Sequence, residues 1–149
     1  MWYVVKKWDD PATPADEFDY EGWFGVRELP QLKETQNSLA QGPKDYIRAV
    51  VKRWMDPNGD GDCSDGIDGW RLDAAEMAPA GFWAEFRGWV KAINPNAYLT
   101  GELWWEDWPN DKMYNAASWL QGDKFDAVMN YRWAREVIRF FVGDTTGTS

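Results

Sequence analysis

Two charged residues lie at the end of a short apolar segment, at a spacing that could support acid–base chemistry. Arg71 and Asp73 are separated by one residue within the segment 66–73, so in a β-strand their side chains point to the same face. A guanidinium beside a carboxyl group favours the ionised form, which a nucleophile requires. The pattern therefore predicts a nucleophilic carboxylate at a strand end, with an arginine–aspartate pair that only fixes a loop as the alternative.

A third charged residue ends the next apolar segment. Glu102 lies in the segment 97–103 and precedes Trp104 and Trp105, whose indole rings would exclude water, raise the pKa of the Glu102 carboxyl group and suit it to act as a general acid. Asp73 and Glu102 are about 30 residues apart, the length of one βα unit, so neighbouring strands would carry them. Two carboxyl groups in different surroundings match the needs of glycoside hydrolysis. An exposed glutamate without a function is the alternative, because such residues are common.

The composition excludes several other classes of site. The chain has 149 residues, no histidine and one cysteine, which excludes Ser-His-Asp hydrolases, Cys-His proteases and most zinc enzymes. Any acid–base chemistry must therefore rest on carboxyl groups. The formal net charge of −9 argues against nucleic acid and anionic membranes as partners. The 12 tryptophans suggest a surface that stacks on the flat apolar faces of sugar rings.

Hydrophobic periodicity indicates how the chain positions these residues, because apolar residues at helical spacing alternate with short apolar runs. The predicted elements are a helix over 45–55, a strand over 66–73, a helix over 82–93, a strand over 97–103, a short helical piece over 115–120, a strand over 125–129 and a helix over 134–141. Strands that alternate with helices form parallel sheets. The predicted fold is α/β, with successive parallel βα units that form an incomplete (β/α)8 TIM barrel, about strands four to six of it.

The chain divides into two regions. Residues 1–41 show no sustained period and are predicted to be an irregular loop region, whereas residues 42–149 are predicted to form the partial catalytic barrel, with a polar loop at 145–149. A closed barrel takes about 250 residues, so the chain is expected to be a piece of a larger one. A doubly wound open sheet is the alternative fold, but no glycine-rich phosphate-binding motif follows a predicted strand.

An acidic loop between the first predicted helix and the first predicted strand resembles half of a calcium-binding loop. Oxygen-bearing side chains stand at alternate positions of the segment 56–65, with a glycine at the sixth position. The candidate calcium ligands are Asp56, Asn58, Asp60, Asp62 and Asp65. Ile67 stands where the bidentate glutamate of such loops would be, but the clustered carboxylates would repel one another without a cation. The loop therefore predicts a structural calcium site, with a solvated turn as the alternative, and Cys63 is expected to be a free thiol without a role.

Four motifs together resemble the α-amylase superfamily, glycoside hydrolase family 13. The segment Asp68–Asp73 resembles the strand that bears the nucleophile in this family, and Thr100–Trp104 resembles the strand that bears the acid/base. Leu29–Leu32 resembles a short family motif that precedes these strands, and Phe125–Tyr131 resembles the sixth strand of the neopullulanase and cyclomaltodextrinase branch. The resemblance extends from about Asp19 to Phe141, and the four motifs in this order make it specific.

The resemblance implies a retaining glycosidase that works by double displacement. By position, Asp73 corresponds to the nucleophile, Arg71 to the residue that holds it and Glu102 to the acid/base, with the two carboxyl groups about 5 to 5.5 Å apart. The family's third essential aspartate lies on a later strand that has no counterpart in this sequence. Many α-amylases follow the nucleophile with a Lys-His pair; Ala74–Met77 stands there instead and favours the neopullulanase-like branch.

The implied substrate is an α-glucan oligosaccharide or polysaccharide, such as a maltooligosaccharide, a cyclodextrin or pullulan, and Trp104 and Trp105 are the candidate residues for binding it. Trp70 points away from Asp73 and is expected to pack between strand and helix. The alternative function is a non-catalytic carbohydrate-binding or regulatory segment with tryptophan platforms. The isolated chain is expected to have little activity. No signal peptide or membrane-spanning run is visible, and the sequence leaves the compartment, the bond preference and the oligomeric state open.

Overall fold

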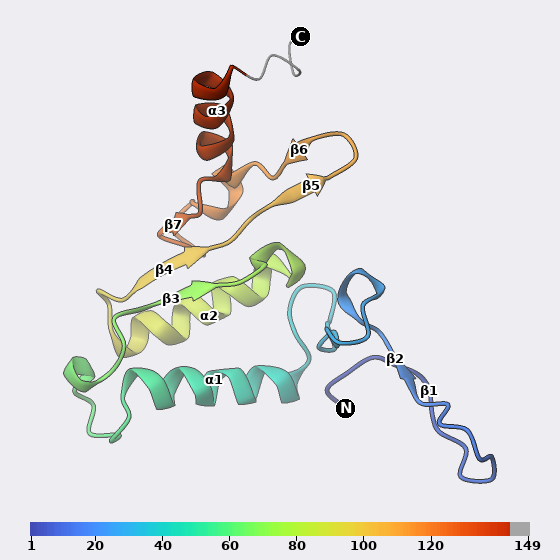
Figure 1. Cartoon of the computed structure of the whole chain (residues 1–149). Coiled ribbons are helices and arrows are strands. Elements are labelled where there is room, and N and C mark those ends of the chain that lie inside the picture. Colours follow the sequence, from blue (N-terminus) through green and yellow to red (C-terminus); the bar gives the residue numbers. More distant parts are fainter. Residues whose placement is uncertain (144–149) are drawn as a thin grey trace.

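The computed structural model describes residues 1–143 and shows a small parallel sheet beside two long helices (Figure 1). In chain order the strands and helices are β1 (Val5–Lys7), β2 (Asp19–Tyr20), α1 (Gln41–Met55), β3 (Gly69–Leu72), α2 (Ala80–Ile93), β4 (Tyr98–Gly101), β5 (Trp105–Asp107), β6 (Lys112–Met113), β7 (Ala127–Val128) and α3 (Tyr131–Val142). Short 3-10 helices occupy Trp23–Gly25, Cys63–Asp65, Ala75–Met77 and Ala116–Trp119.

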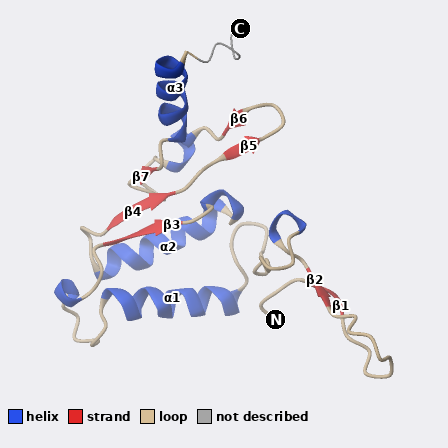
Figure 2. Ribbon diagram, viewed as in Figure 1, coloured by secondary structure: helices blue, strands red, loops and turns tan. Residues whose placement is uncertain are grey.

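The parallel sheet consists of β3, β4 and β7, with β4 in the centre (Figure 2). In the register of β3 and β4, Arg71 lies opposite Thr100 and Leu72 lies opposite Gly101. The predicted fold class, an α/β chain of successive parallel βα units, is confirmed. Each strand is shorter than the apolar segment that predicted it, because the flanking residues turn into loops.

The hydrophobic core lies between the sheet and the layer formed by α1 and α2 (Figure 1). Trp70 meets Phe86 of α2 edge to face, with ring centroids 5.9 Å apart, which confirms its predicted position between strand and helix. The buried core includes Val51, Met55, Leu72, Phe82, Trp83, Phe86, Val90, Leu99 and Phe125. Arg71 and Tyr98 lie on the other face of the sheet and are exposed, so only one face of this sheet is covered by helices.

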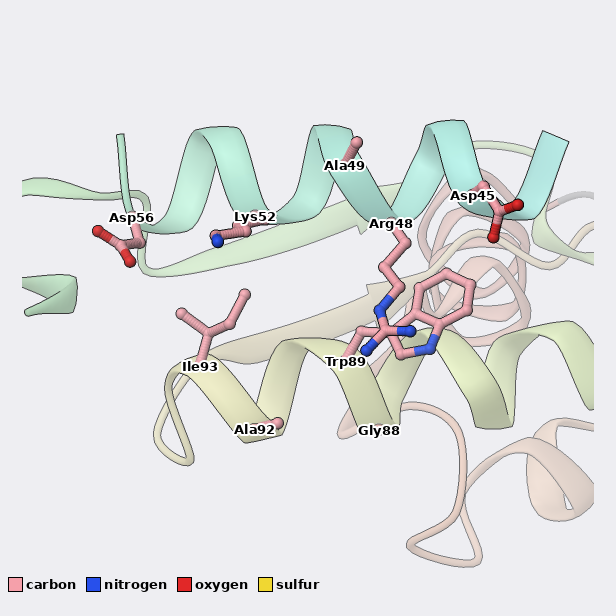
Figure 3. A pocket seen from close by; sticks show the side chains of 9 residues that line it. All are labelled: Asp45, Arg48, Ala49, Lys52, Asp56, Gly88, Trp89, Ala92 and Ile93. Carbon is pink, nitrogen blue, oxygen red and sulfur yellow. The ribbon is translucent and has the colours of Figure 1, made fainter. Parts of the chain in front are cut away.

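A groove of about 460 Å³ runs between α1 and α2 (Figure 3). The guanidinium of Arg48 on α1 lies over the ring of Trp89 on α2, 6.0 Å from its centroid, and small residues of both helices leave the groove open. Its lining contains none of Arg71, Asp73 and Glu102. The groove therefore belongs to the helix layer and not to the candidate catalytic residues.

Asp126 fixes β7 beside β4. Its carboxylate accepts hydrogen bonds from Nη1 of Arg87 at 2.8 Å, from Nζ of Lys91 at 3.0 Å and from the backbone N–H of Leu99 at 2.9 Å. Burial alone would raise the pKa of Asp126, but these donors outweigh burial and lower the pKa below its ordinary value. An ionised carboxylate thus ties the third strand to both α2 and β4.

Two hairpins depart from the elements predicted from sequence. The segment 1–41, predicted to be irregular, contains the antiparallel pair β1–β2, and a second antiparallel pair, β5–β6, follows β4. These strands are only two or three residues long, too short for a hydrophobic period to indicate them. The predicted polar loop 145–149 lies outside the described residues.

α3 is amphipathic and leaves most of its apolar face uncovered. Ile138, Phe140 and Phe141 are all largely exposed, whereas Arg135 and Arg139 on the polar side pair with Asp111 of the β5–β6 hairpin. An exposed apolar face of this kind favours association with other apolar surfaces. Among the helices within residues 1–143, none is both long enough and apolar enough to span a membrane.

Candidate active site

The register of the sheet brings two carboxyl groups to one edge. Because Leu72 and Gly101 are paired, Asp73 and Glu102 are the next residues of two adjacent parallel strands, at their carboxyl ends. The alternation of side chains along β3 places Arg71 on the same side as Asp73. The carboxyl ends of parallel strands are where a TIM barrel builds its catalytic site.

One guanidinium connects the two carboxyl groups. Nη1 of Arg71 donates to Oδ1 of Asp73, and Nη2 of Arg71 lies 2.8 Å from Oε2 of Glu102. The predicted contact between Arg71 and Asp73 is confirmed. A single planar group therefore holds both carboxyl groups close together, and the spacing of about 5 to 5.5 Å between them stays a prediction. The side chain of Asp73 is 77% exposed, so it is open to a ligand from the solvent side.

Glu102 is surrounded by hydrogen-bond donors. The residue is only 7% exposed. Its Oε1 accepts from the hydroxyl of Tyr131 at 2.5 Å and from Nε1 of Trp104 at 2.8 Å, while its Oε2 accepts from the backbone N–H of Ala74 at 3.1 Å in addition to Arg71. Every donor on this carboxyl group stabilises its ionised form.

The ionisation of Glu102 is the opposite of what the sequence predicted. Burial alone raises the pKa of its carboxyl group, as expected beside indole rings, but the hydrogen bonds from Tyr131, Ala74 and Trp104 and the charge of Arg71 outweigh burial and lower the pKa to about 2. The prediction of a raised pKa was wrong because the Trp104 ring meets the carboxylate with its N–H. In this chain Glu102 is therefore an anion at neutral pH.

Acid should weaken the fold through Glu102. The pKa in the folded state, about 2, lies below the ordinary value of 4.5, so the stabilisation from ionised Glu102 is fully present above about pH 4.5 and is lost as pH falls towards 2. The amount is on the order of 3 kcal/mol in the free energy of unfolding. Urea unfolding of the chain at pH 6 and pH 3, compared with Glu102→Gln, measures it: the variant should lose less stability between the two pH values. An equal loss in both proteins would contradict the expectation.

Tyr131 is a site residue that the sequence analysis did not single out. It begins α3, directly after β7, and its ring stacks on that of Trp104 with centroids 3.6 Å apart and planes inclined by 21°. The two rings therefore support each other while both donate to Glu102. A signal was present, because Tyr131 ends the motif Phe125–Tyr131 at the carboxyl end of the third parallel strand and lies 29 residues after Glu102, about one βα unit further along the chain.

The two predicted substrate-binding tryptophans lie in different places. Trp104 contacts Glu102, one of its faces is covered by Tyr131, and the residue is 37% exposed. Trp105 lies in the β5–β6 hairpin, where its ring packs edge to face against Trp108 and the guanidinium of Arg135 lies 5.8 Å from its centroid. The structure thus brings Trp104 to the carboxyl groups and places Trp105 against the base of α3.

The acidic loop 56–65 folds as a chain of local turns. Oδ1 of Asp56, Asn58, Asp60 and Asp62 each accepts a backbone N–H from two or three residues later, at 2.8 to 2.9 Å, and Asp65 closes a short 3-10 helix. Within residues 1–143, no three aspartate, glutamate or cysteine side chains converge as a ready metal-binding group. The oxygen ligands are of the type that calcium prefers, but they are turned towards the loop's own backbone. The calcium site stays a prediction.

Known proteins resemble this chain in both sequence and structure. It is 38% identical to neopullulanase 2 of Thermoactinomyces vulgaris over 141 residues, which are 94% of this chain and 20% of that protein. It is 35% identical to a cyclomaltodextrinase of a Bacillus species over 149 residues, covering 89% of this chain and 24% of that protein. Among solved structures, the debranching enzyme of Nostoc punctiforme superimposes with a TM-score of 0.70 at 36% identity, covering 96% of this chain and 26% of that one. No family model matches.

The fold matches a segment of TIM-barrel enzymes and covers about a quarter of their chains. The relatives that match about 90% of the chain belong to the α-amylase family, on the branch whose members are named neopullulanase, cyclomaltodextrinase and maltogenic amylase, which confirms the predicted resemblance. The chain spans about a fifth to a quarter of the length of the curated relatives it matches.

Proposed function

We propose that the protein containing these residues is a retaining glycosidase that acts on α-glucans, with Asp73 as the nucleophile and Glu102 as the acid/base. The observation that carries the proposal is the guanidinium of Arg71, shared by two carboxyl groups at adjacent strand ends. If Arg71 and Asp73 only fixed a loop, their pairing would not require a second, buried carboxyl group, that of Glu102, on the same guanidinium.

The proposed reaction has two displacements. In the first, Glu102 gives a proton to the glycosidic oxygen as the bond from that oxygen to the sugar's anomeric carbon breaks, and an oxygen of Asp73 bonds to that carbon. In the second, ionised Glu102 takes a proton from water, the water oxygen bonds to the anomeric carbon and the bond to Asp73 breaks. Arg71 keeps Asp73 ionised before attack and stabilises it as the leaving carboxylate.

The first displacement needs Glu102 in its protonated form. In this chain its pKa is about 2, because four donors stabilise the anion. A bound sugar ring would exclude water from the site, and a further carboxylate, such as the third aspartate that the resemblance implies, would add a like charge; both changes raise the pKa of a carboxyl group. We infer that substrate and the remainder of the barrel supply the proton affinity that the chain lacks.

The substrate class rests on the relatives and on the tryptophans. Neopullulanase 2 and the cyclomaltodextrinase carry names that refer to pullulan and cyclodextrins, both of which are α-glucans. Trp104 offers an indole beside Glu102 that could contact a sugar ring. A non-catalytic carbohydrate-binding segment is the second candidate, and it predicts sugar binding that is unaffected by loss of either carboxyl group.

A chimaeric enzyme tests the proposal. In this enzyme the chain replaces the matching 141 residues of neopullulanase 2, and the anomeric form of the sugar released from pullulan is followed by NMR. A retaining site releases the α-anomer first, and Asp73→Asn should abolish release. Initial release of the β-anomer, or turnover that survives Asp73→Asn, would overturn the assignment of the nucleophile.

We also propose that calcium binds the loop 56–65 and stabilises the fold. The support is the alternate spacing of oxygen ligands, each of which keeps further acceptor positions after its backbone hydrogen bond. Because a ligand that binds only the folded state stabilises it, the midpoint of thermal unfolding should rise with added calcium, and Asp60→Ala should remove most of the rise. An unchanged midpoint in the original chain would leave the loop as a plain turn.

A further inference from the structure

Glu76 is a half-buried acid that the proposed reaction does not use. It lies in the 3-10 helix Ala75–Met77, which directly follows Asp73 and the left-handed residue Ala74 (φ 42°). Its Oε1 accepts a hydrogen bond from the backbone N–H of Trp104 at 3.2 Å. Its Oε2 is buried and, among the residues that the structure describes, has no hydrogen-bond partner. A buried oxygen of this kind requires an explanation, because leaving it unpaired is unfavourable.

The contact with Trp104 links Glu76 to Glu102. The backbone of Trp104 is held by Glu76, while its ring donates from Nε1 to Oε1 of Glu102 at 2.8 Å and stacks on Tyr131. Trp104 is therefore held at both its backbone and its ring. The tether crosses from the segment after β3 to the segment after β4, so it also joins the two loops that extend the catalytic strand ends.

Protonation of Glu76 would lower the cost of the oxygen without a partner, because burying a neutral carboxyl group is less unfavourable than burying a carboxylate. Burial raises the pKa of Glu76, and the nearby charges of Glu102 and Asp73 raise it further against two hydrogen bonds that lower it. The pKa of Glu76 thus lies above 4.5, whereas that of Glu102 is about 2. Glu76 therefore takes up a proton at a higher pH than Glu102 does, and in its protonated form it is a neutral acceptor and not a third anion.

We propose that Glu76 is a positioning residue: through the backbone of Trp104 it keeps the indole N–H on Glu102. The tether itself is a property of this chain, and only its catalytic meaning rests on the proposed role of Glu102. A side chain at position 76 that accepts a hydrogen bond without charge should serve equally well. A side chain of similar size that cannot accept one should release Trp104 and weaken its hydrogen bond to the Glu102 carboxylate.

NMR titration of the chain tests the proposal without any requirement for catalysis. The carboxyl carbon of Glu102 is followed by ¹³C shifts and the indole N–H of Trp104 by ¹⁵N shifts, in the original chain, Glu76→Leu and Glu76→Gln. Loss of one donor to the carboxylate should raise the pKa of Glu102 by about one unit in Glu76→Leu. Glu76→Gln, the uncharged acceptor, should leave that pKa unchanged, and the carboxyl of Glu85 in α2 serves as an internal control in every spectrum.

The outcomes separate positioning from a general structural role. A shifted pKa of Glu102 in Glu76→Leu, with a changed Trp104 indole signal and normal values in Glu76→Gln, supports the proposal. Unchanged values in Glu76→Leu, or equal shifts in both variants, would overturn it. Where Glu76→Leu does not fold, the original chain supplies a second measurement: the backbone amide signal of Trp104 should titrate with the Glu76 carboxyl, and an amide that does not respond would also overturn the proposal. Failure of the chimaeric enzyme to retain configuration would refute the proposed function and leave these outcomes untouched.

Discussion

The purified 149-residue chain is expected to release reducing sugar from maltooligosaccharides or cyclodextrin at close to the uncatalysed rate. Three features of its structure account for this. The side chain of Asp73 is 77% exposed, so water reaches the site and weakens every electrostatic contact there. Glu102 is ionised, with a pKa of about 2, and cannot donate a proton at neutral pH. The third carboxylate that the resemblance implies is not part of the sequence, and each lost transition-state contact typically lowers the rate by about 10²- to 10³-fold.

The same structure predicts that the chain associates in solution. β3 and β7 each leave one edge of the parallel sheet unpaired within the described residues, and α3 exposes an apolar face. Light scattering at several concentrations measures this association alongside the sugar assay. Rapid turnover that disappears in both Asp73→Asn and Glu102→Gln would contradict the expectation, because the chain would then contain a complete catalytic site.

The positions of Asp73, Arg71 and Glu102 follow from regularities that a sequence displays. A period of two along a strand places Arg71 and Asp73 on one side, and a repeat of about 30 residues places Glu102 on the next strand. Because Leu72 pairs with Gly101 in the parallel register, the residues that follow them, Asp73 and Glu102, are neighbours. These features depend on the backbone alone, which is why the sequence was sufficient.

The surroundings of Glu102 could not be predicted in the same way. Whether an indole ring raises or lowers the pKa of a carboxyl group depends on whether it presents its face or its N–H, and side-chain torsions decide this for Trp104. Tyr131, the first residue of α3, and Glu76, in a short 3-10 helix, reach the same region through local packing: a left-handed turn at Ala74 and the stack of Tyr131 on Trp104. The 29-residue interval between Glu102 and Tyr131 brings Tyr131 to the next strand end, but no periodicity encodes which atoms these side chains present to Glu102, so the sign of the pKa shift required the structure.

An activated substrate should separate the two proposed carboxyl roles by a large factor. In the chimaeric enzyme, Glu102→Gln should lower turnover of pullulan by about 10²- to 10⁴-fold, because the leaving oxygen no longer receives a proton. With α-maltosyl fluoride the leaving group is fluoride, which departs without a proton, so the first displacement should remain fast in this variant. The second displacement lacks its base, and a maltosyl ester on Asp73 should accumulate and be visible by mass spectrometry.

Asp73→Asn should behave differently with both substrates. Without the nucleophile no ester forms, and release of fluoride should fall on the order of 10⁴-fold, since the chemistry of the remaining groups cannot replace a missing covalent step. Glu106→Gln provides a matched control, because Glu106 is an exposed acid of β5 whose one ion pair within residues 1–143 is with Lys112, and the change should affect neither reaction. Equal losses in Glu102→Gln and Asp73→Asn with the fluoride substrate would contradict the separate roles. In that case the two carboxyl groups would act as one unit joined by Arg71, and the shared guanidinium would explain the equal losses.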